Sequence, residues 1–182
     1  MIYFITETYL KTNTPITANV DVTDVTPYVK TQSDLRIQPI LGTYFYNYLL
    51  AEYNAQTLNA NETLLVEKIK PCIAWYSAVD AVFGLSYQLK NKGLQQQNGD
   101  YSTSVSRSEV AFGMEHYEEK AAFYERRLRE WLKEQVKANP TIFPEFVSPL
   151  NTDSDMKPLK DEDQNGYNIG DRKSTRLNSS HR

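Results

Sequence analysis

The sequence contains few side chains of the types that perform catalysis or bind metals. It has one cysteine, Cys72, and two histidines, His116 and His181. Zinc sites need several such ligands, and a Ser-His-Asp triad needs a histidine beside a reactive serine. No Gly-x-Ser-x-Gly turn and no glycine-rich phosphate loop occurs. We therefore predict a non-enzymatic protein without metal or cofactor, with Cys72 buried and His116 on a helix surface.

One acidic stretch resembles the start of a calcium-binding loop. Asp161, Asp163, Asn165 and Gly166 match its first six positions. The closing glutamate would fall at position 172, which is arginine. We expect a solvated acidic tail here, with calcium binding or a metal-dependent enzyme as remote alternatives.

Residues 171–181 look like the translated start of a common sequencing adapter. We therefore expect residues 171–182 to be non-native and the natural sequence to continue elsewhere after about Gly170. These twelve residues hold four basic side chains and one acidic one, so the formal charge of residues 1–170 is −6 rather than −3. The basic C-terminus disappears with them, which removes the support for a nucleic-acid-binding tail.

The length and composition suit one domain with a buried core. No apolar run is long enough to span a membrane, and the first residues do not resemble a secretory signal. We therefore expect synthesis in the cytoplasm and no membrane contact. The 13 tyrosines suit either a protein-binding surface or a tyrosine-rich core.

The first half of the sequence predicts three helices after a leading arm. In the arm, Thr6 could cap a short helix over 7–11, and residues 16–22 alternate as an extended segment does. Thr26-Pro27 predicts a helix start, and Pro39 predicts its end. A second helix follows Gly42, with an apolar face formed by Tyr44, Phe45, Tyr48 and Leu49.

The third helix is predicted to begin at Asn61 and to be central. Its apolar face comprises Leu65, Ile69, Cys72, Ile73, Tyr76, Val79 and Phe83. Pro71 should kink or split it. Residues 90–105 read as a polar loop, with a hairpin possible near Asn98-Gly99.

The last helix has the clearest local pattern. Ser106 and Glu109 fit a capping box, and Asn139-Pro140 ends the helix. Its apolar residues follow a heptad-like spacing: Val110, Met114, Tyr117, Ala121, Tyr124, Leu128 and Trp131. This seam could face the domain's own core or a coiled-coil partner, and Leu128→Asp would distinguish the two.

These patterns predict a mainly α fold, a small bundle of about four helices with a long C-terminal helix, a polar loop and extended terminal arms. We assign residues 1–23 to an arm, 24–139 to the helical domain, 140–170 to a proline-rich acidic tail and 171–182 to the artefact. Aromatic side chains in the arms and loop are the candidate assembly contacts: Phe4, Tyr101, Phe143 and Phe146.

Several stretches resemble a known set of proteins: Tyr3–Leu10, Pro39–Leu50, Ile69–Ala78, Asn91–Gly93 and Ala122–Leu128. Over residues 1–150 they look like an uncharacterised family from tailed phages and prophages of gut Bacteroidota. The order of elements is also similar to that of head–tail connector proteins of long-tailed phages. The long polar loop and the proline-rich tail depart from that pattern.

The resemblance implies a virion structural protein that forms a neck-ring adaptor beneath the portal. Its expected partners are further copies in a homo-oligomeric ring, the portal, and tail or neck proteins. DNA would pass nearby without specific binding, since an acidic subunit repels phosphates. The alternative is a helical protein-binding module that uses the 110–131 seam.

Overall fold

The computed structural model describes residues 3–17, 19–90, 93–96 and 107–156. Its elements are α1 (Glu7–Asn13), α2 (Val22–Gln32), the π-helical turn η1 (Ser33–Ile37), α3 (Gln38–Leu41), α4 (Thr43–Ala55), α5 (Ala60–Ser86), β1 (Tyr87–Lys90), β2 (Gly93–Gln96), α6 (Arg107–Ala138) and α7 (Pro144–Val147). The fold is mainly α, as predicted.

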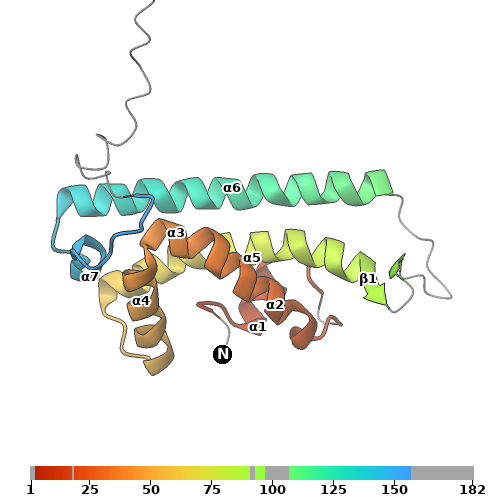
Figure 1. Ribbon diagram of the computed structural model, residues 1–182, viewed down its shortest axis with the longest axis horizontal. Coiled ribbons are helices and arrows are strands. Elements are labelled where there is room, and N and C mark those ends of the chain that lie inside the picture. Colours follow the sequence, from red (N-terminus) through yellow and green to blue (C-terminus); the bar gives the residue numbers. More distant parts are fainter. Residues whose placement is uncertain (1–2, 18, 91–92, 97–106, 157–182) are drawn as a thin grey trace, which may run out of the picture.

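Helices α5 and α6 form the framework of the molecule. Figure 1 shows the long helix α6 lying along α5, with the β-hairpin at one end of the pair and α4 and α7 at the other. At about 1.5 Å per residue, α6 extends roughly 48 Å. Figure 1 shows that the chain runs along α5 toward the hairpin and returns along α6, so the two helices are antiparallel.

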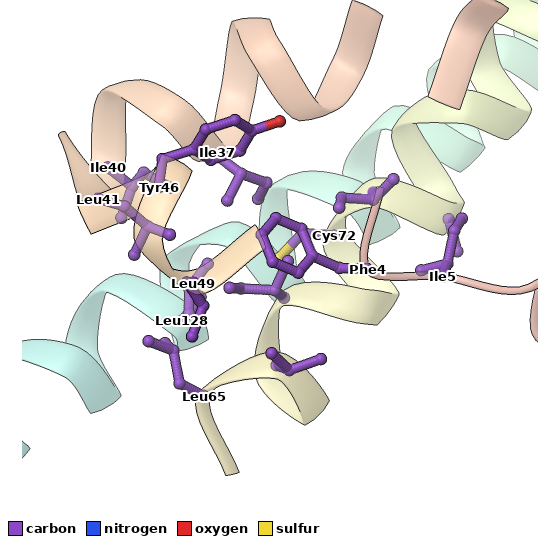
Figure 2. Packing of buried hydrophobic residues seen from close by; sticks show 14 of the residues in the cluster. Phe4, Ile5, Ile37, Ile40, Leu41, Tyr46, Leu49, Leu65, Cys72 and Leu128 are labelled. Carbon is purple, nitrogen blue, oxygen red and sulfur yellow. The ribbon is translucent and has the colours of Figure 1, made fainter. Parts of the chain in front are cut away.

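A single hydrophobic core joins the helices to both terminal segments. Figure 2 shows Phe4 beside Cys72 of α5, close to Leu49 of α4 and Leu128 of α6. Phe143 and Phe146 belong to the same cluster. The predicted arm and tail therefore pack into the domain, at least over residues 3–16 and 140–156.

The N-terminal segment contains one confirmed cap and one wrong helix start. Thr6 Oγ1 accepts a hydrogen bond from the Tyr9 amide at 3.1 Å, as expected of the cap of α1. Helix α2 begins at Val22 rather than at Thr26-Pro27, because Asp21 caps it by accepting from the Thr23 amide at 2.8 Å. Pro27 therefore lies inside the helix, on an exposed position.

Pro39 does not end the helical path as the sequence predicted. The turn preceding it is π-helical, and the Gln38 amide donates to the Ser33 carbonyl five residues earlier. This wider turn leaves room for the proline ring, which would clash with the preceding turn of an α-helix. The chain stays helical to Leu41 and then breaks at Gly42, where φ is +80°.

The start of α5 is set by Asn59 rather than by Asn61. The Asn59 side chain accepts from the Glu62 amide at 3.0 Å, and the Glu62 carboxylate accepts from the Asn59 amide at 2.9 Å. This reciprocal pair is a capping box. Helix α5 then continues through Pro71 without the predicted split. Phe83, which was predicted to face the core, is exposed on α5.

The loop after α5 begins with a β-hairpin. Strands β1 and β2 pair antiparallel, with Tyr87 opposite Gln96 and Lys90 opposite Gly93. The hairpin thus lies earlier in the sequence than Asn98-Gly99. Residues 97–106, including Ser106 of the predicted capping box, lie outside the described residues.

Candidate protein-interaction surfaces

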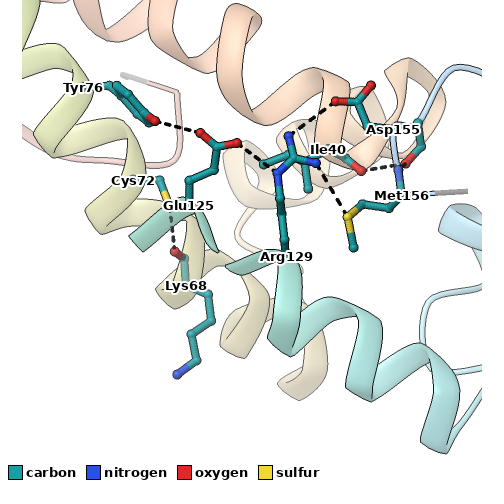
Figure 3. A network of polar contacts seen from close by, with 9 residues as sticks. Ile40, Lys68, Cys72, Tyr76, Glu125, Arg129, Asp155 and Met156 are labelled. Carbon is teal, nitrogen blue, oxygen red and sulfur yellow. Dashed lines mark hydrogen bonds and ion pairs between the residues drawn. The ribbon is translucent and has the colours of Figure 1, made fainter. Parts of the chain in front are cut away.

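One network of polar side chains joins three parts of the fold. The Tyr76 hydroxyl on α5 donates to Glu125 on α6 at 2.8 Å, and Arg129 Nε donates to the same carboxylate at 2.9 Å. Figure 3 shows the Arg129 guanidinium continuing toward Asp155, at 3.4 Å, and toward the Met156 sulfur, at 3.7 Å. The network therefore fastens the C-terminal segment to the α5–α6 pair.

The geometry of this network favours a structural role over a chemical one. Burial, followed by the hydrogen bond to Glu125, raises the pKa of the Tyr76 hydroxyl. The Arg36 guanidinium stacks 4.3 Å from the Tyr76 ring centroid. The Tyr76 hydroxyl thus stays protonated, and contacts with Glu125 and Arg36 hold the side chain in place. Such a side chain suits the role of a fixed hydrogen-bond donor.

Cys72 is a buried thiol, as predicted. Its side chain lies in the core, and Sγ lies 3.6 Å from the Lys68 carbonyl oxygen. Burial raises the pKa of the Cys72 thiol, which keeps it in the unreactive protonated form.

We expect iodoacetamide at pH 8 to label native Cys72 at least about a hundredfold more slowly than the urea-unfolded chain, because labelling needs an opening of the core. Mass spectrometry over time measures both rates. Rapid labelling of the native chain would contradict the packing of α5 against α6.

His116 lies on the exposed side of α6. Its Nδ1 is 4.0 Å from the Glu119 carboxylate, and both side chains are more than half exposed. Within the described part of the chain, no three His, Cys, Asp or Glu side chains come together in a way that could hold a metal ion. Residues Asp161, Asp163, Asn165 and Gly166 of the calcium-like stretch lie outside the described residues.

Three of the four predicted assembly contacts are core residues. Phe4 packs 5.7 Å from the Tyr46 ring, and Phe45 packs 5.7 Å from Phe143 and 5.8 Å from Phe146. All three predicted contacts are buried, so a folded subunit cannot offer them to a neighbour. Tyr101 lies outside the described residues.

The apolar seam of α6 is occupied by the domain itself. Ala121 and Leu128 are buried, and Tyr124 and Trp131 are partly buried against the same core. The side chain of Val110 is not described. From Ala121 to Trp131, therefore, the seam does not face a coiled-coil partner.

Aromatic side chains are exposed elsewhere, at positions that the sequence patterns did not single out as contacts. Phe112 is 75% exposed, Phe83 is 48% exposed and Phe123 is 44% exposed. Phe112 and Phe123 lie off the seam and eleven residues apart, which is about three helical turns, so both occur on the outer side of α6. An apolar side chain at a helix position outside the apolar seam is the sequence signal that could have identified Phe112 and Phe123 as exposed.

Two open hollows occur on the described surface, and Phe123 lines one of them. One, of about 360 Å³, is lined by Trp75, Glu119, Lys120, Phe123 and Tyr124. The other, of about 310 Å³, lies where Pro15, Ile16 and Val20 meet the end of α5 and Tyr117. Both hollows are open to solvent, and aromatic or apolar side chains form most of their lining.

Comparison with known proteins assigns the family. A family described as one of unknown function, DUF6712, matches residues 37–156, about two thirds of the chain. The chain belongs to DUF6712. The matched part of this DUF6712 chain runs from the end of η1 to Met156, so it includes the α5–α6 pair and the C-terminal segment that Arg129 holds.

No curated protein and no solved structure matches the chain. Among the described residues, no helix combines the length and the apolar character needed to cross a bilayer.

Proposed function

We propose that the chain is a structural protein of a tailed-phage virion, a head–tail connector or neck-ring adaptor that is made in the bacterial cytoplasm. The observation that carries the proposal is the set of exposed aromatic residues Phe83, Phe112 and Phe123. Phe123 also lines a hollow, and large apolar side chains exposed beside such a hollow are typical of protein–protein interfaces.

The stretches that resemble phage proteins support this proposal through their places in the fold. Pro39–Leu50 spans α3 and α4, Ile69–Ala78 lies on α5 and Ala122–Leu128 lies on α6. Their buried residues pack together in the core, among them Leu49, Ile73 and Leu128. The resemblance thus concerns the residues that build one shared framework.

The anchoring of the C-terminal segment also suits a subunit that carries mechanical load. Asn151 donates through Nδ2 to the Leu41 and Phe146 carbonyls at 2.8 and 3.0 Å, and Ser154 donates to the Ile40 carbonyl at 2.6 Å. The Asp155 amide adds a bond to the Pro39 carbonyl at 2.8 Å. These bonds hold the segment against α3 independently of any partner.

A neck ring surrounds DNA without gripping it, and the charges of α6 suit that role. Glutamates lie among the basic residues on its exposed surface, so no basic run extends along the whole described length of this helix. An uninterrupted stripe would bind phosphates and slow the passage of DNA. We therefore expect no specific DNA binding.

The proposal is tested with a portal protein encoded near the gene of this chain. We expect the two proteins, when co-expressed, to elute together from a size-exclusion column as a ring-shaped complex visible by electron microscopy. A fibre or capsid protein from the same genome serves as the control partner. A chain that elutes apart from the portal, alone or mixed, would contradict the proposal.

A further inference from the structure

The exposed surface of α6 carries two stripes of opposite charge with the same spacing. One stripe consists of Ala111, Glu115, Glu118 and Ala122, and the other of His116, Lys120, Phe123 and Arg127. Both follow steps of four, three and four residues, so each forms a continuous line on the helix. Seen along the helix axis, at about 100° per residue, the centres of the two lines are roughly 140° apart across the exposed side of α6. Leu128 is buried on the opposite side, so one line lies on each side of it.

The basic stripe has cations without carboxylate partners beside an apolar hollow. Within the described residues, neither Lys120 nor Arg127 has a carboxylate within 4 Å. Lys120 Nζ lies 4.5 Å from the Trp75 ring centroid, and the Arg127 guanidinium lies 5.6 Å from that of Phe123. Lys120 lines the hollow of about 360 Å³ together with Glu119 and with Phe123, which is 44% exposed.

The acidic stripe is complementary in charge and in shape. Glu115 and Glu118 are exposed and lie between two exposed alanines, Ala111 and Ala122. Alanine side chains are short, so another helix or the edge of an aromatic ring can approach the backbone closely. When the two stripes are aligned residue by residue, Glu115 lies opposite Lys120 and Glu118 lies opposite Phe123. Glu118 then lies between the two cations, while the small Ala122 faces Arg127.

We propose that copies of this chain associate head to tail, the acidic stripe of one α6 against the basic aromatic stripe of the next. When one surface of a subunit binds a different surface of the next subunit, the same contact repeats from copy to copy. The copies form a closed ring if the successive rotations between neighbours add up to a full turn. This inference rests on the proposed function and names the contact between neighbouring subunits of the ring. The two stripes are offset by five residues, so neighbouring helices are staggered by about 7.5 Å.

Charge reversal in the full chain tests the contact. Glu115→Lys with Glu118→Lys makes both stripes basic, and Lys120→Glu with Arg127→Glu makes both acidic. We expect each double variant to weaken self-association at low salt at least about tenfold, as measured by light scattering and native mass spectrometry, and sodium chloride to weaken the wild type in the same direction. An equimolar mixture of the two variants should restore self-association, because alternating variants pair a basic stripe with an acidic one at each contact.

The matched control is Lys133→Glu with Lys137→Glu, which changes the charge of α6 by the same amount beyond the C-terminal ends of both stripes. This variant should assemble as the wild type does, and circular dichroism should show all variants folded. The inference is overturned if the wild type stays monomeric, if either double variant assembles like the wild type, or if the mixture stays dissociated. Double variants that assemble normally on a portal would overturn this contact and leave the proposed function standing.

Discussion

Replacing Leu128 by aspartate should leave the chain without a cooperative unfolding transition. Leu128 is fully buried between α5 and α6. Removing such a side chain costs about 2–5 kcal/mol, and a buried carboxylate without a partner adds several more. The sum approaches the whole stability of a typical domain, about 5–15 kcal/mol. Circular dichroism during urea titration measures the transition.

The matched control for this variant is Phe112→Asp on the same helix. Phe112 is 75% exposed, so the same kind of change should leave the unfolding midpoint almost unaltered. A cooperatively folding Leu128→Asp chain would show that the seam is not part of the core. The hypothesis of a coiled-coil binding module would then return.

Gly42→Ala is the second change with a large expected effect. Gly42 joins α3 to α4 at a φ of +80°, and a Cβ there would overlap the Asn151 side-chain amide. Moving Asn151 would break its buried hydrogen bonds to the Leu41 and Phe146 carbonyls. Strain and lost hydrogen bonds together should cost about 3 kcal/mol or more, measured as a lower urea midpoint.

Gly113→Ala provides the control for the glycine effect. Gly113 lies within α6, and nothing occupies the space where its Cβ would be. Alanine should there stabilise the helix by up to about 1 kcal/mol. If Gly42→Ala were as stable as the wild type, the docking of Asn151 at the α3–α4 junction would be wrong.

Local signals in the sequence predicted some of the helix ends at which a side chain acts on its own helix. Thr6 caps α1, and Asn139-Pro140 follows the last residue of α6, as expected. Pro27 and Pro39 were misleading, because an Asp21 cap and a π turn let the helical path pass through them. Such compensation depends on neighbouring turns and tertiary packing, which a single proline does not reveal.

The candidate site was harder to predict, because burial depends on the whole fold. Phe143 and Phe146 follow a helix-ending proline in a segment rich in acids and prolines, which is also the pattern of an arm that reaches a partner. In the structure the chain turns back, and both rings pack against Phe45. Composition alone does not distinguish an anchor within the subunit from an anchor between subunits.

The measurement that tests the central claim most directly is the mass of the full chain in solution, by native mass spectrometry and light scattering, with and without a candidate portal. The proposed function predicts a closed oligomer of defined copy number, alone or on the portal. A chain that remains monomeric at high concentration and does not bind the portal would contradict the claim that this helical subunit builds a ring.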